Sequence, residues 1–252
     1  MSARHKYWRV WEEAVASLLH RDLAERCAAA GYRYEGDGIK VVFLDRRYVL
    51  VRHGSSLTIV NADPGSPEES TATEEAASLS SELQEEHLRD RILILHYLER
   101  ASGAPLSGNM VGFDQLSGAR FYGSPFRGRV ELPLVQTFSS RPGALLESAQ
   151  ALGGSAASYG DCSVLLHPFP RVPLAFILWQ GDDEIPANGK MLFDACAEDY
   201  LSAEDLTVLG ETVVRRFRAL DTEVEPRRAR RAGAALGCTE GAASTAHAPF
   251  KA

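Results

Sequence analysis

The chain has 252 residues, of which 45% are hydrophobic and 24% are charged, and its formal net charge is −7. This length and composition are typical of a globular protein with a substantial core. The acidic balance argues against a broad nucleic-acid-binding surface, which needs clustered Lys and Arg. The main basic cluster is interpreted as a solvated helix end and tail, so we expect no nucleic-acid partner. The cluster consists of Arg215, Arg216, Arg218, Arg227, Arg228, Arg230 and Arg231.

The N-terminal sequence MSARHKYWRVWEEAV is charged from its start and lacks the apolar core of a signal peptide. No apolar run approaches the roughly 18 residues that a membrane span needs. We therefore expect a soluble, cytoplasmic protein with no membrane partner. The four cysteines are far apart, show no zinc or iron–sulfur spacing, and are interpreted as buried free thiols, so no metal is assigned. They are Cys27, Cys162, Cys196 and Cys238.

The first part of the chain predicts a helix, a meander and a loop. Apolar residues recur at steps of three and four from Trp8 to Ala30, which predicts an amphipathic helix that Gly31 can end. The sequence IKVVFLDRRYVLVRHGSSLTIV, residues 39–60, contains short β-branched runs and predicts about three strands. Residues 61–78 lack apolar periodicity and are rich in Pro, Ser, Thr and Glu, which predicts an acidic mobile loop or linker.

A second helix and a glycine-rich segment follow. Leucines and isoleucines spaced from Leu88 to Leu98 predict a helix, and Gly103 can stop it. Residues 103–134 mix glycines with aromatic and turn residues, which predicts short strands and loops rather than regular helix. The segment contains neither GxxxxGK[ST] nor GxGxxG between a strand and a helix, so we do not interpret it as a phosphate-binding loop.

Two further helices have recognisable ends. Ser140 can cap a helix that Gly153 and Gly154 end. Ser202 and Asp205 have the spacing of a capping box, which predicts the start of the last helix. Between these helices, CSVLLHPF and PLAFILW predict two strands, but the prolines around their junction argue against regular pairing between them. These prolines are Pro168, Pro170 and Pro173.

Strands and helices are mixed without a regular alternation, which favours an α+β fold with short, largely antiparallel strands and about four packed helices. We predict that residues 1–222 form a single domain, with 61–78 as its acidic loop. Residues 223–252 are rich in Ala, Gly and Arg and show no pattern, which predicts a disordered tail.

Three carboxylates, Asp182, Asp183 and Glu184, follow the apolar strand that ends at Trp179. Such a group could bind a hard cation, hold a basic ligand, or supply a general acid whose pKa rises through mutual repulsion. Strand geometry would let Asp182 and Glu184 converge while Asp183 points away. The alternative is a polar turn whose charge stops the strand and prevents edge pairing.

Four other residues could contribute to a site. Arg171 lies in a proline-held turn, where a guanidinium could bind a carboxylate or phosphate, or pair internally with one of the acids. His96 and its neighbour Tyr97 lie within an apolar helix, where a buried histidine would titrate according to its surroundings or simply be a hydrogen-bonded core residue. Asp194 adds negative charge near the acid group or caps a helix.

The chain resembles an uncharacterised family of mostly anaerobic bacteria and archaea, the domain of unknown function 3786. The resemblance rests on ILILHYLERASGAPLSG, GFDQLSGARFYGSPF, ALGG and FPRVPLAFILWQGDDEIPANGKMLFDACAEDYLSAED, and covers roughly residues 8–218. Ile185 stands where the family usually has phenylalanine. The most specific matching positions are Pro170, Arg171, Pro173, Trp179, Asp183, Glu184, Pro186, Leu192, Phe193 and Asp194.

The resemblance implies no activity, although the lineages suggest one-carbon or corrinoid metabolism. Some members join this domain to a cysteine-rich iron–sulfur segment, which this sequence lacks. No cofactor follows from the residues.

Three functional hypotheses remain open. The first is a binding or accessory protein of anaerobic metabolism that recognises a small ligand or a partner protein. Its surface would comprise Arg171, Trp179, Asp182, Asp183, Glu184 and Asp194. The second is an enzyme acting on a small polar metabolite, with Glu184 or Asp182 as general acid or base and His96 or Tyr97 assisting, and it requires these groups to converge around one cavity. The third makes all of them turn and capping residues.

Overall fold

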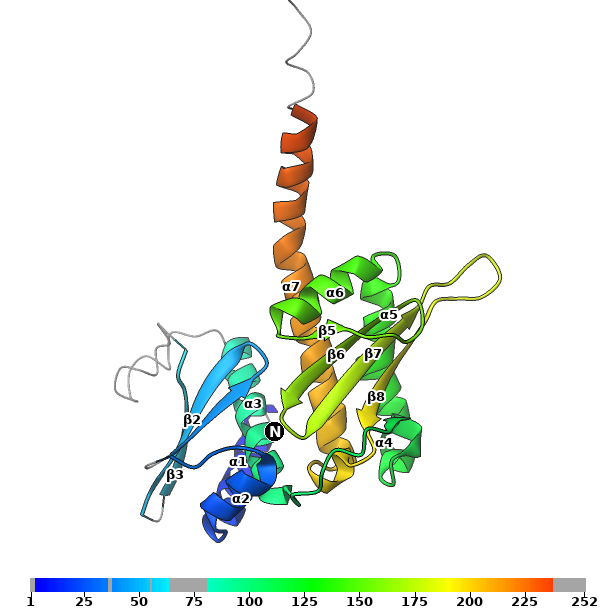
Figure 1. Ribbon diagram of the computed structural model, residues 1–252. Helices are drawn as coiled ribbons and strands as arrows, with labels where there is room; N and C mark the ends of the chain where they lie inside the picture. Colours follow the sequence, from blue (N-terminus) through cyan, green and yellow to red (C-terminus); the bar gives the residue numbers. More distant parts are fainter. Residues whose placement is uncertain (1–2, 36–37, 55, 64–80, 238–252) are drawn as a thin grey trace, which may run out of the picture.

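Two antiparallel sheets and the helices that cover them form the structure (Figure 1). The computed structural model describes residues 3–35, 38–54, 56–63 and 81–237, and the side chains within 7–35, 38–54, 56–63 and 84–222. The predicted acidic loop therefore lies outside the described residues from position 64 onward. Helices and separate short antiparallel sheets confirm the predicted α+β class.

The first sheet is the predicted three-stranded meander, with strand order β1-β2-β3. Its residues alternate between buried and exposed, as expected for strands with one covered face. Phe43, Tyr48 and Ile59 belong to its buried face. The strands are β1 (Gly38–Phe43), β2 (Arg46–His53) and β3 (Ser56–Asn61).

Three helices lie with the first sheet: α1 (Ala3–Leu19), α2 (Leu23–Ala30) and α3 (Ser81–Arg100). The prediction of one helix ending at Gly31 is wrong, because the structure has two helices, α1 and α2, that are separated at Asp22. Its carboxylate accepts hydrogen bonds from the N–H groups of Ala24 and Glu25, so this residue starts a new helix instead of continuing the old one. Gly31 ends α2 with a left-handed φ of 81°, as predicted.

The second sheet has the strand order β4-β8-β7-β6-β5, and every neighbouring pair is antiparallel. Its central strand β7 is buried from Val172 to Leu178, which explains the uninterrupted apolar sequence. The strands are β4 (Met110–Gly112), β5 (Ser155–Ala156), β6 (Cys162–Phe169), β7 (Val172–Trp179) and β8 (Asn188–Asp194).

The expectation that prolines prevent regular pairing of β6 with β7 is wrong. The strands form a hairpin that pairs in register from Cys162 to Leu166, and only the stretch between Leu166 and Phe169 is irregular. Pro168 and Pro173 both fall within this interruption, where no regular ladder hydrogen bond is lost.

Residues 103–134 are also more helical than predicted. After a short 3₁₀ turn, consecutive helical segments run to Phe138. The segments are η3 (Phe113–Gln115), α4 (Ala119–Phe126), the π-helical η4 (Arg127–Glu131) and α5 (Leu132–Phe138). Phe126, Val130 and Leu134 are buried at steps of four, and this packing outweighs the low helix propensity of the intervening glycines.

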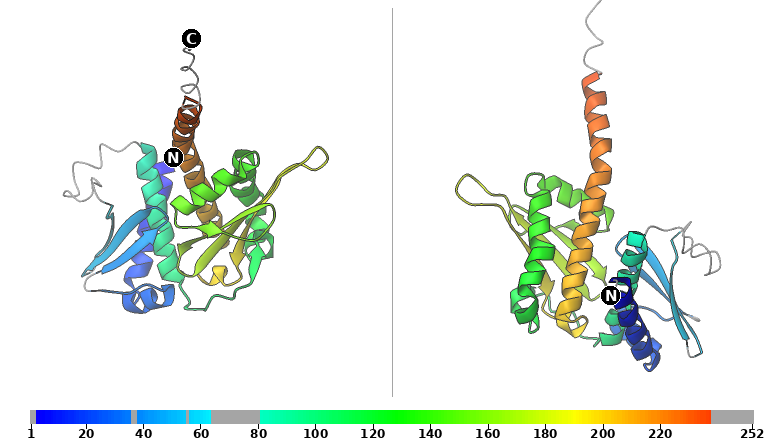
Figure 2. Two further views of the ribbon diagram at one scale, coloured as in Figure 1. Left: turned by 45° about the horizontal axis from the view of Figure 1, so that its top comes forward. Right: turned by 180° about the vertical axis from the view of Figure 1, so that it is seen from behind.

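The second sheet is also covered by α6 (Pro142–Ala151) and by the long helix α7 (Ala203–Gly237), which follows η5 (Ala197–Asp199) (Figure 2). The predicted capping box at the start of α7 is confirmed, since Ser202 Oγ accepts from the N–H of Asp205, whose carboxylate accepts from the N–H of Ser202. Helix α6 begins at Pro142 rather than directly after Ser140.

Helix α7 continues to Gly237, whereas the sequence predicted disorder from residue 223. Ala, Arg and Glu are strong helix formers, so this segment can extend a helix already held by the core. The rest of the predicted tail, residues 238–252, lies outside the described residues. Within the described part of the chain, no helix combines the length and apolar character that crossing a membrane requires.

Stacked aromatic rings connect the two sheets. The ring of Phe169 on β6 lies 5.0 Å from that of Phe43 on β1 and 4.2 Å from that of Tyr97 on α3. Tyr97 in turn stacks on Tyr200 at 5.6 Å. Because these four fully buried rings come from both sheets, from α3 and from the segment before α7, they fix how the two halves pack.

We predict that Phe169→Ala lowers the free energy of unfolding by about 3–5 kcal/mol, because the substitution leaves a cavity at this junction. Chemical denaturation would measure the loss. The exposed neighbour His167 provides the matched control, and His167→Ala should change stability by no more than about 0.5 kcal/mol. Equal effects of the two substitutions would contradict a structural role for the ring stack.

Candidate functional site

The acid group lies in the loop between β7 and β8, which projects from the second sheet (Figure 1). Asp182, Asp183 and Glu184 are all exposed. Asp182 accepts hydrogen bonds from the N–H groups of Ile185 and Glu184 at 2.7 and 2.9 Å, and these bonds lower the pKa of its carboxyl group. The geometry is that of a polar turn, as one of the sequence interpretations expects.

Arg171 is not part of this surface. It lies in the turn before β7, whereas the acids follow the other end of the same strand. Eight strand residues at about 3.3 Å each separate the two ends by roughly 25 Å. The expected pairing of Arg171 with the acids is therefore wrong, and so is its placement beside Trp179. A fully extended strand cannot bring its two ends together.

Asp194 stabilises a loop at the opposite end of β8 from the acid group. Its buried carboxylate accepts hydrogen bonds from the N–H groups of Ser107, Gly108 and Cys196 at 2.8–3.0 Å, and from the hydroxyl of Ser107 at 2.7 Å. Although burial opposes ionisation, the hydrogen bonds from Cys196 and Ser107 hold the pKa of Asp194 well below its usual range. The geometry gives Asp194 a structural role, as the third hypothesis expects, although it holds a loop and does not cap a helix.

Tyr97 is a fully buried core residue. Its hydroxyl donates a 2.6 Å hydrogen bond to the carbonyl of Ala30 and accepts a 3.2 Å bond from the N–H of Arg171. Burial raises the pKa of Tyr97 well above its usual value. With these partners the hydroxyl has no access to a substrate.

His96 forms a partly buried pair with Asp205 across α3 and α7. The distance from its Nδ1 to the Asp205 Oδ1 is 2.7 Å. Burial lowers the pKa of His96, but the hydrogen bond to Asp205 and the charge of that carboxylate raise it more, so the net shift is upward. For Asp205, burial opposes ionisation, but His96 lowers the pKa below its usual value.

The four residues of the proposed enzyme site do not converge. Asp182 and Glu184 lie in the exposed loop, while His96 and Tyr97 belong to α3 and already have partners in the fold. General acid–base catalysis needs its groups within hydrogen-bonding reach around one cavity. This set therefore does not form that cavity.

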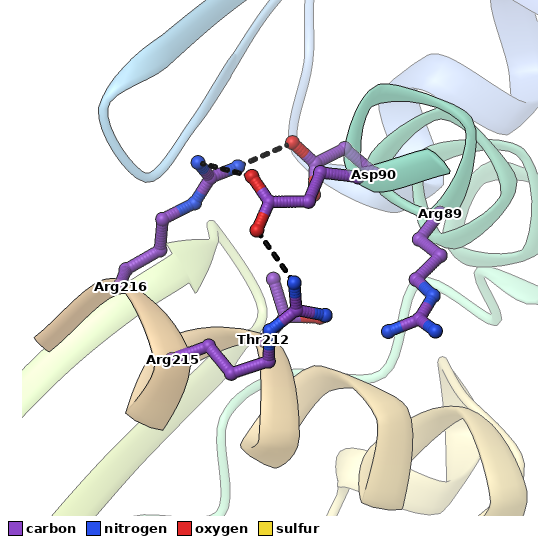
Figure 3. Close-up of a pocket in the computed structure, with 6 residues that line it drawn as sticks. Arg89, Asp90, Thr212, Arg215 and Arg216 are labelled. Atoms are coloured by element: carbon purple, nitrogen blue, oxygen red, sulfur yellow. Dashed lines mark hydrogen bonds and ion pairs between the residues drawn. The ribbon is translucent and has the colours of Figure 1, made fainter. Parts of the chain in front are cut away.

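A cluster of charged residues lies between α3, α7 and the first sheet (Figure 3). The interpretation of Arg215 and Arg216 as part of a solvated helix end is wrong, because both pair with Glu86 and Arg216 is only 8% exposed. The carboxylate of Asp90 is 1% exposed, and its Oδ2 accepts bonds from Arg46 at 3.0 Å, Arg216 at 2.8 Å and the Tyr48 hydroxyl at 2.8 Å. The only part of this cluster that the sequence could indicate is the pair Glu86 and Asp90, which lie four residues apart on one helix face. Their partners on α7 are more than a hundred residues away and could not be assigned.

Glu86 extends this cluster to the surface. It pairs with Arg215 at 2.6 Å, Arg46 at 3.2 Å and Arg216 at 3.4 Å. Burial raises the pKa of Glu86, but the three guanidinium groups lower it more, so Glu86 is ionised at neutral pH. A cavity of about 10 Å³ lies beside the cluster, which is the space of about one water molecule. The arrangement suits structural cross-linking, not the binding of an organic ligand.

Three cysteines lie within the described residues and are free thiols. Cys27 and Cys196 are buried, as expected, and Cys162 is half-buried. Burial raises the pKa of Cys27 to about 12 and that of Cys196 to about 11, so neither is a reactive thiolate at neutral pH. Within the described ranges, no three His, Cys, Asp or Glu residues form a group suited to a metal ion.

An open groove of about 490 Å³ lies between η3, α4, η4 and β8. Its charged side chains come from all four segments and were not among the predicted site residues. The sequence signal was the mixture of arginines, aromatic residues and glycines, which we interpreted as short strands and loops. The groove is lined by Phe113, Asp114, Ala119, Arg120, Gly123, Phe126, Arg127, Glu131 and Lys190.

We predict that Asp90→Asn lowers the free energy of unfolding by about 3–5 kcal/mol, because Arg46 and Arg216 would lose the buried charge that they share and keep only the more exposed Glu86 and Asp45. Urea denaturation would measure this loss. Asp45→Asn is the matched control, since Asp45 is 39% exposed and lies 3.6 Å from Arg216. A similar loss in both variants would contradict the central position of Asp90.

The His96–Asp205 pair predicts a pH-dependent contribution to stability. Because folding raises the pKa of His96 above 6.5, the contribution is complete below that pH and disappears as the pH rises through the folded-state value. His96→Gln should therefore destabilise the protein by about 1 kcal/mol more at pH 6 than at pH 9, measured by denaturation. In an Asp205→Asn background the same substitution should show no such pH dependence. Persistence of the difference would contradict the pairing.

Comparison with known proteins identifies a family but no activity. A family model described as Domain of unknown function (DUF3786) matches residues 22–216, which is most of the 252-residue chain. The comparisons with curated proteins and with solved structures gave no significant match. The protein therefore belongs to the DUF3786 family.

Proposed function

We propose that this protein is a non-catalytic accessory protein that binds a partner protein through the loop between β7 and β8. The observation that carries the proposal is the exposure of large apolar side chains at this projecting end of the second sheet. Ile185 is 66% exposed and Trp179 is 37% exposed. Exposed apolar side chains beside polar ones are typical of protein-binding surfaces.

The charge of the loop defines the partner. The sequence QGDDEIPAN from residue 180 to residue 188 contains three carboxylates and neither Lys nor Arg. Within the part of the chain that the structure describes, the side chains of Asp183 and Glu184 have no hydrogen-bonding or ion-pairing partner. A partner with basic residues around an apolar depression would complement this surface.

The loop is held in one shape, which favours binding because less conformational entropy is lost. The N–H of Asp182 donates to the carbonyl of Ile185 at 2.8 Å, and the N–H of Gln180 donates to the Asp161 carboxylate at 2.8 Å. Gly181 is tightly enclosed, because a Cβ atom there would lie 2.3 Å from the backbone nitrogen of Ala187.

We place the partner in anaerobic one-carbon or corrinoid metabolism, the setting that the family resemblance suggests. The enzyme alternative has less support, because its four candidate groups lie apart. An accessory role requires only the exposed loop and its charge.

We predict that charge reversal in the loop, Asp183→Lys with Glu184→Lys, abolishes recovery of the partner because like charges then face each other. The tagged full-length chain would be expressed in its native host, cross-linked, purified and analysed by quantitative mass spectrometry. The control is Glu12→Lys with Glu13→Lys, which makes the same charge change at exposed positions of α1. Proteins recovered with the wild type and the control, but lost with the loop variant, are the expected result.

A purified candidate partner would then be titrated against the same three proteins. Trp179→Ala should weaken binding at least tenfold while changing the unfolding free energy by much less than the 3–5 kcal/mol typical of a core tryptophan. Equal recovery and equal affinity for the wild type and the loop variant would refute the proposal.

A further inference from the structure

We propose that the groove between η3, α4, η4 and β8 binds a small organic anion that carries an apolar, planar part. The site is separate from the accessory surface, because it is built from other residues and takes a ligand of another class. Its volume of about 490 Å³ lies within the range of small-molecule sites, roughly 300–1,000 Å³.

The positive charge of the groove comes from three different segments. Arg120 belongs to α4, Arg127 to η4 and Lys190 to β8. Among the described residues, neither guanidinium forms a hydrogen bond or an ion pair, so their donors are available to a ligand. Arginine presents donors in a fixed planar arrangement that matches the oxygens of carboxylates, phosphates and sulfonates.

Two carboxylates also line the groove and partly balance these cations. Asp114 lies 3.9 Å from Lys190 and is largely exposed. Glu131 is half-buried, and burial raises its pKa, although Lys190 and Arg127 oppose the shift. The three cations of the lining still outnumber its two carboxylates by one.

The wall of the groove supplies the apolar contact. The rings of Phe113 and Phe126 stack with their centroids 4.0 Å apart and their planes within 5°. Both line the groove next to Ala119 and Gly123, and because Phe113 is 4% and Phe126 is 2% exposed, only a small part of each ring reaches its surface. An aromatic or other flat apolar group can contact this wall while its anionic end meets the guanidinium groups.

The backbone at the site is also unusual. Residues Arg127–Glu131 form a π-helical turn between α4 and α5 and contribute two of the charged lining residues. π-Helical turns are rare and occur frequently at functional sites, because the extra residue redirects neighbouring side chains. Here the turn places Arg127 and Glu131 on the groove while Val130 remains buried.

Two aromatic probes that differ in charge can test both parts of the proposed ligand. 8-Anilinonaphthalene-1-sulfonate is an anion, and N-phenyl-1-naphthylamine is its neutral counterpart. Fluorescence titration of the full-length folded protein should show saturable binding of the sulfonate at least about tenfold tighter than binding of the neutral amine, the difference that one charge-assisted hydrogen bond provides. The affinity for the sulfonate should fall as salt concentration rises.

Paired arginine substitutions test the location. Arg127→Gln should weaken sulfonate binding about tenfold, because it removes a lining cation. Arg129→Gln is the matched control on the same π-helical turn, since Arg129 points to Glu211 at 3.9 Å and does not line the groove. This control should leave the affinity within about twofold of the wild type, because an exposed charge outside the groove is screened.

Paired glycine substitutions test the space. A Cβ atom at Gly123 or at Gly128 meets nothing within 4 Å, so both positions accept a larger side chain. Only Gly123 lines the groove, so Gly123→Leu should block both probes and Gly128→Leu should block neither. Circular dichroism and urea denaturation would show that each variant is folded.

The proposal is overturned by any of three results with folded proteins. The sulfonate does not bind the wild type, the neutral amine binds as tightly as the sulfonate, or the substitutions within each pair have equal effects. None of these results bears on partner recovery by the loop between β7 and β8, so the two proposals fail independently.

Discussion

The buried carboxylate of Asp90 is the electrostatic constraint on which the packing of the two halves depends. Two guanidinium groups and a phenol from two different segments, β2 and α7, converge on one of its oxygens. An unpaired charge in this position would strongly destabilise the fold, so Arg46 on β2 and Arg216 on α7 must both stay close to α3. The carboxylate therefore holds both the first sheet and the last helix against α3.

Other contacts between the two halves also hold them in one relative orientation. The His96–Asp205 pair connects α3 to the start of α7, and the packed rings of Phe43, Phe169 and Tyr97 fill the space between the sheets. Apolar contact supplies most of the stabilisation there, whereas the charge pairs select one relative orientation, since a shifted helix would leave buried charges without partners. Each half thus depends on the other for its polar groups.

Both proposed sites lie away from this junction. The loop between β7 and β8 projects from the second sheet (Figure 1). The groove is lined by residues of η3, α4, the π-helical turn and β8. A rigid junction with binding elements at its periphery is a common arrangement, because surface loops and helix irregularities can vary without disturbing the core. The two sites share β8, which carries Lys190 only a few residues after the loop. A ligand in the groove and a partner on the loop would therefore contact neighbouring parts of one strand.

The sequence by itself determined the elements whose signals are local. The meander followed from alternation in residues 39–60, the end of α2 from Gly31, and the start of α7 from Ser202 and Asp205, because each signal lies within a few residues of its effect. The length of the apolar run that forms β7 could also be read from the sequence, and this length already separates Arg171 from the acid group. Tertiary structure alone decided the partners of Asp90, the helical state of residues 119–138 and the groove. These depend on contacts between segments far apart in the chain, such as the 126 positions that separate Asp90 from Arg216, and no local pattern encodes such contacts.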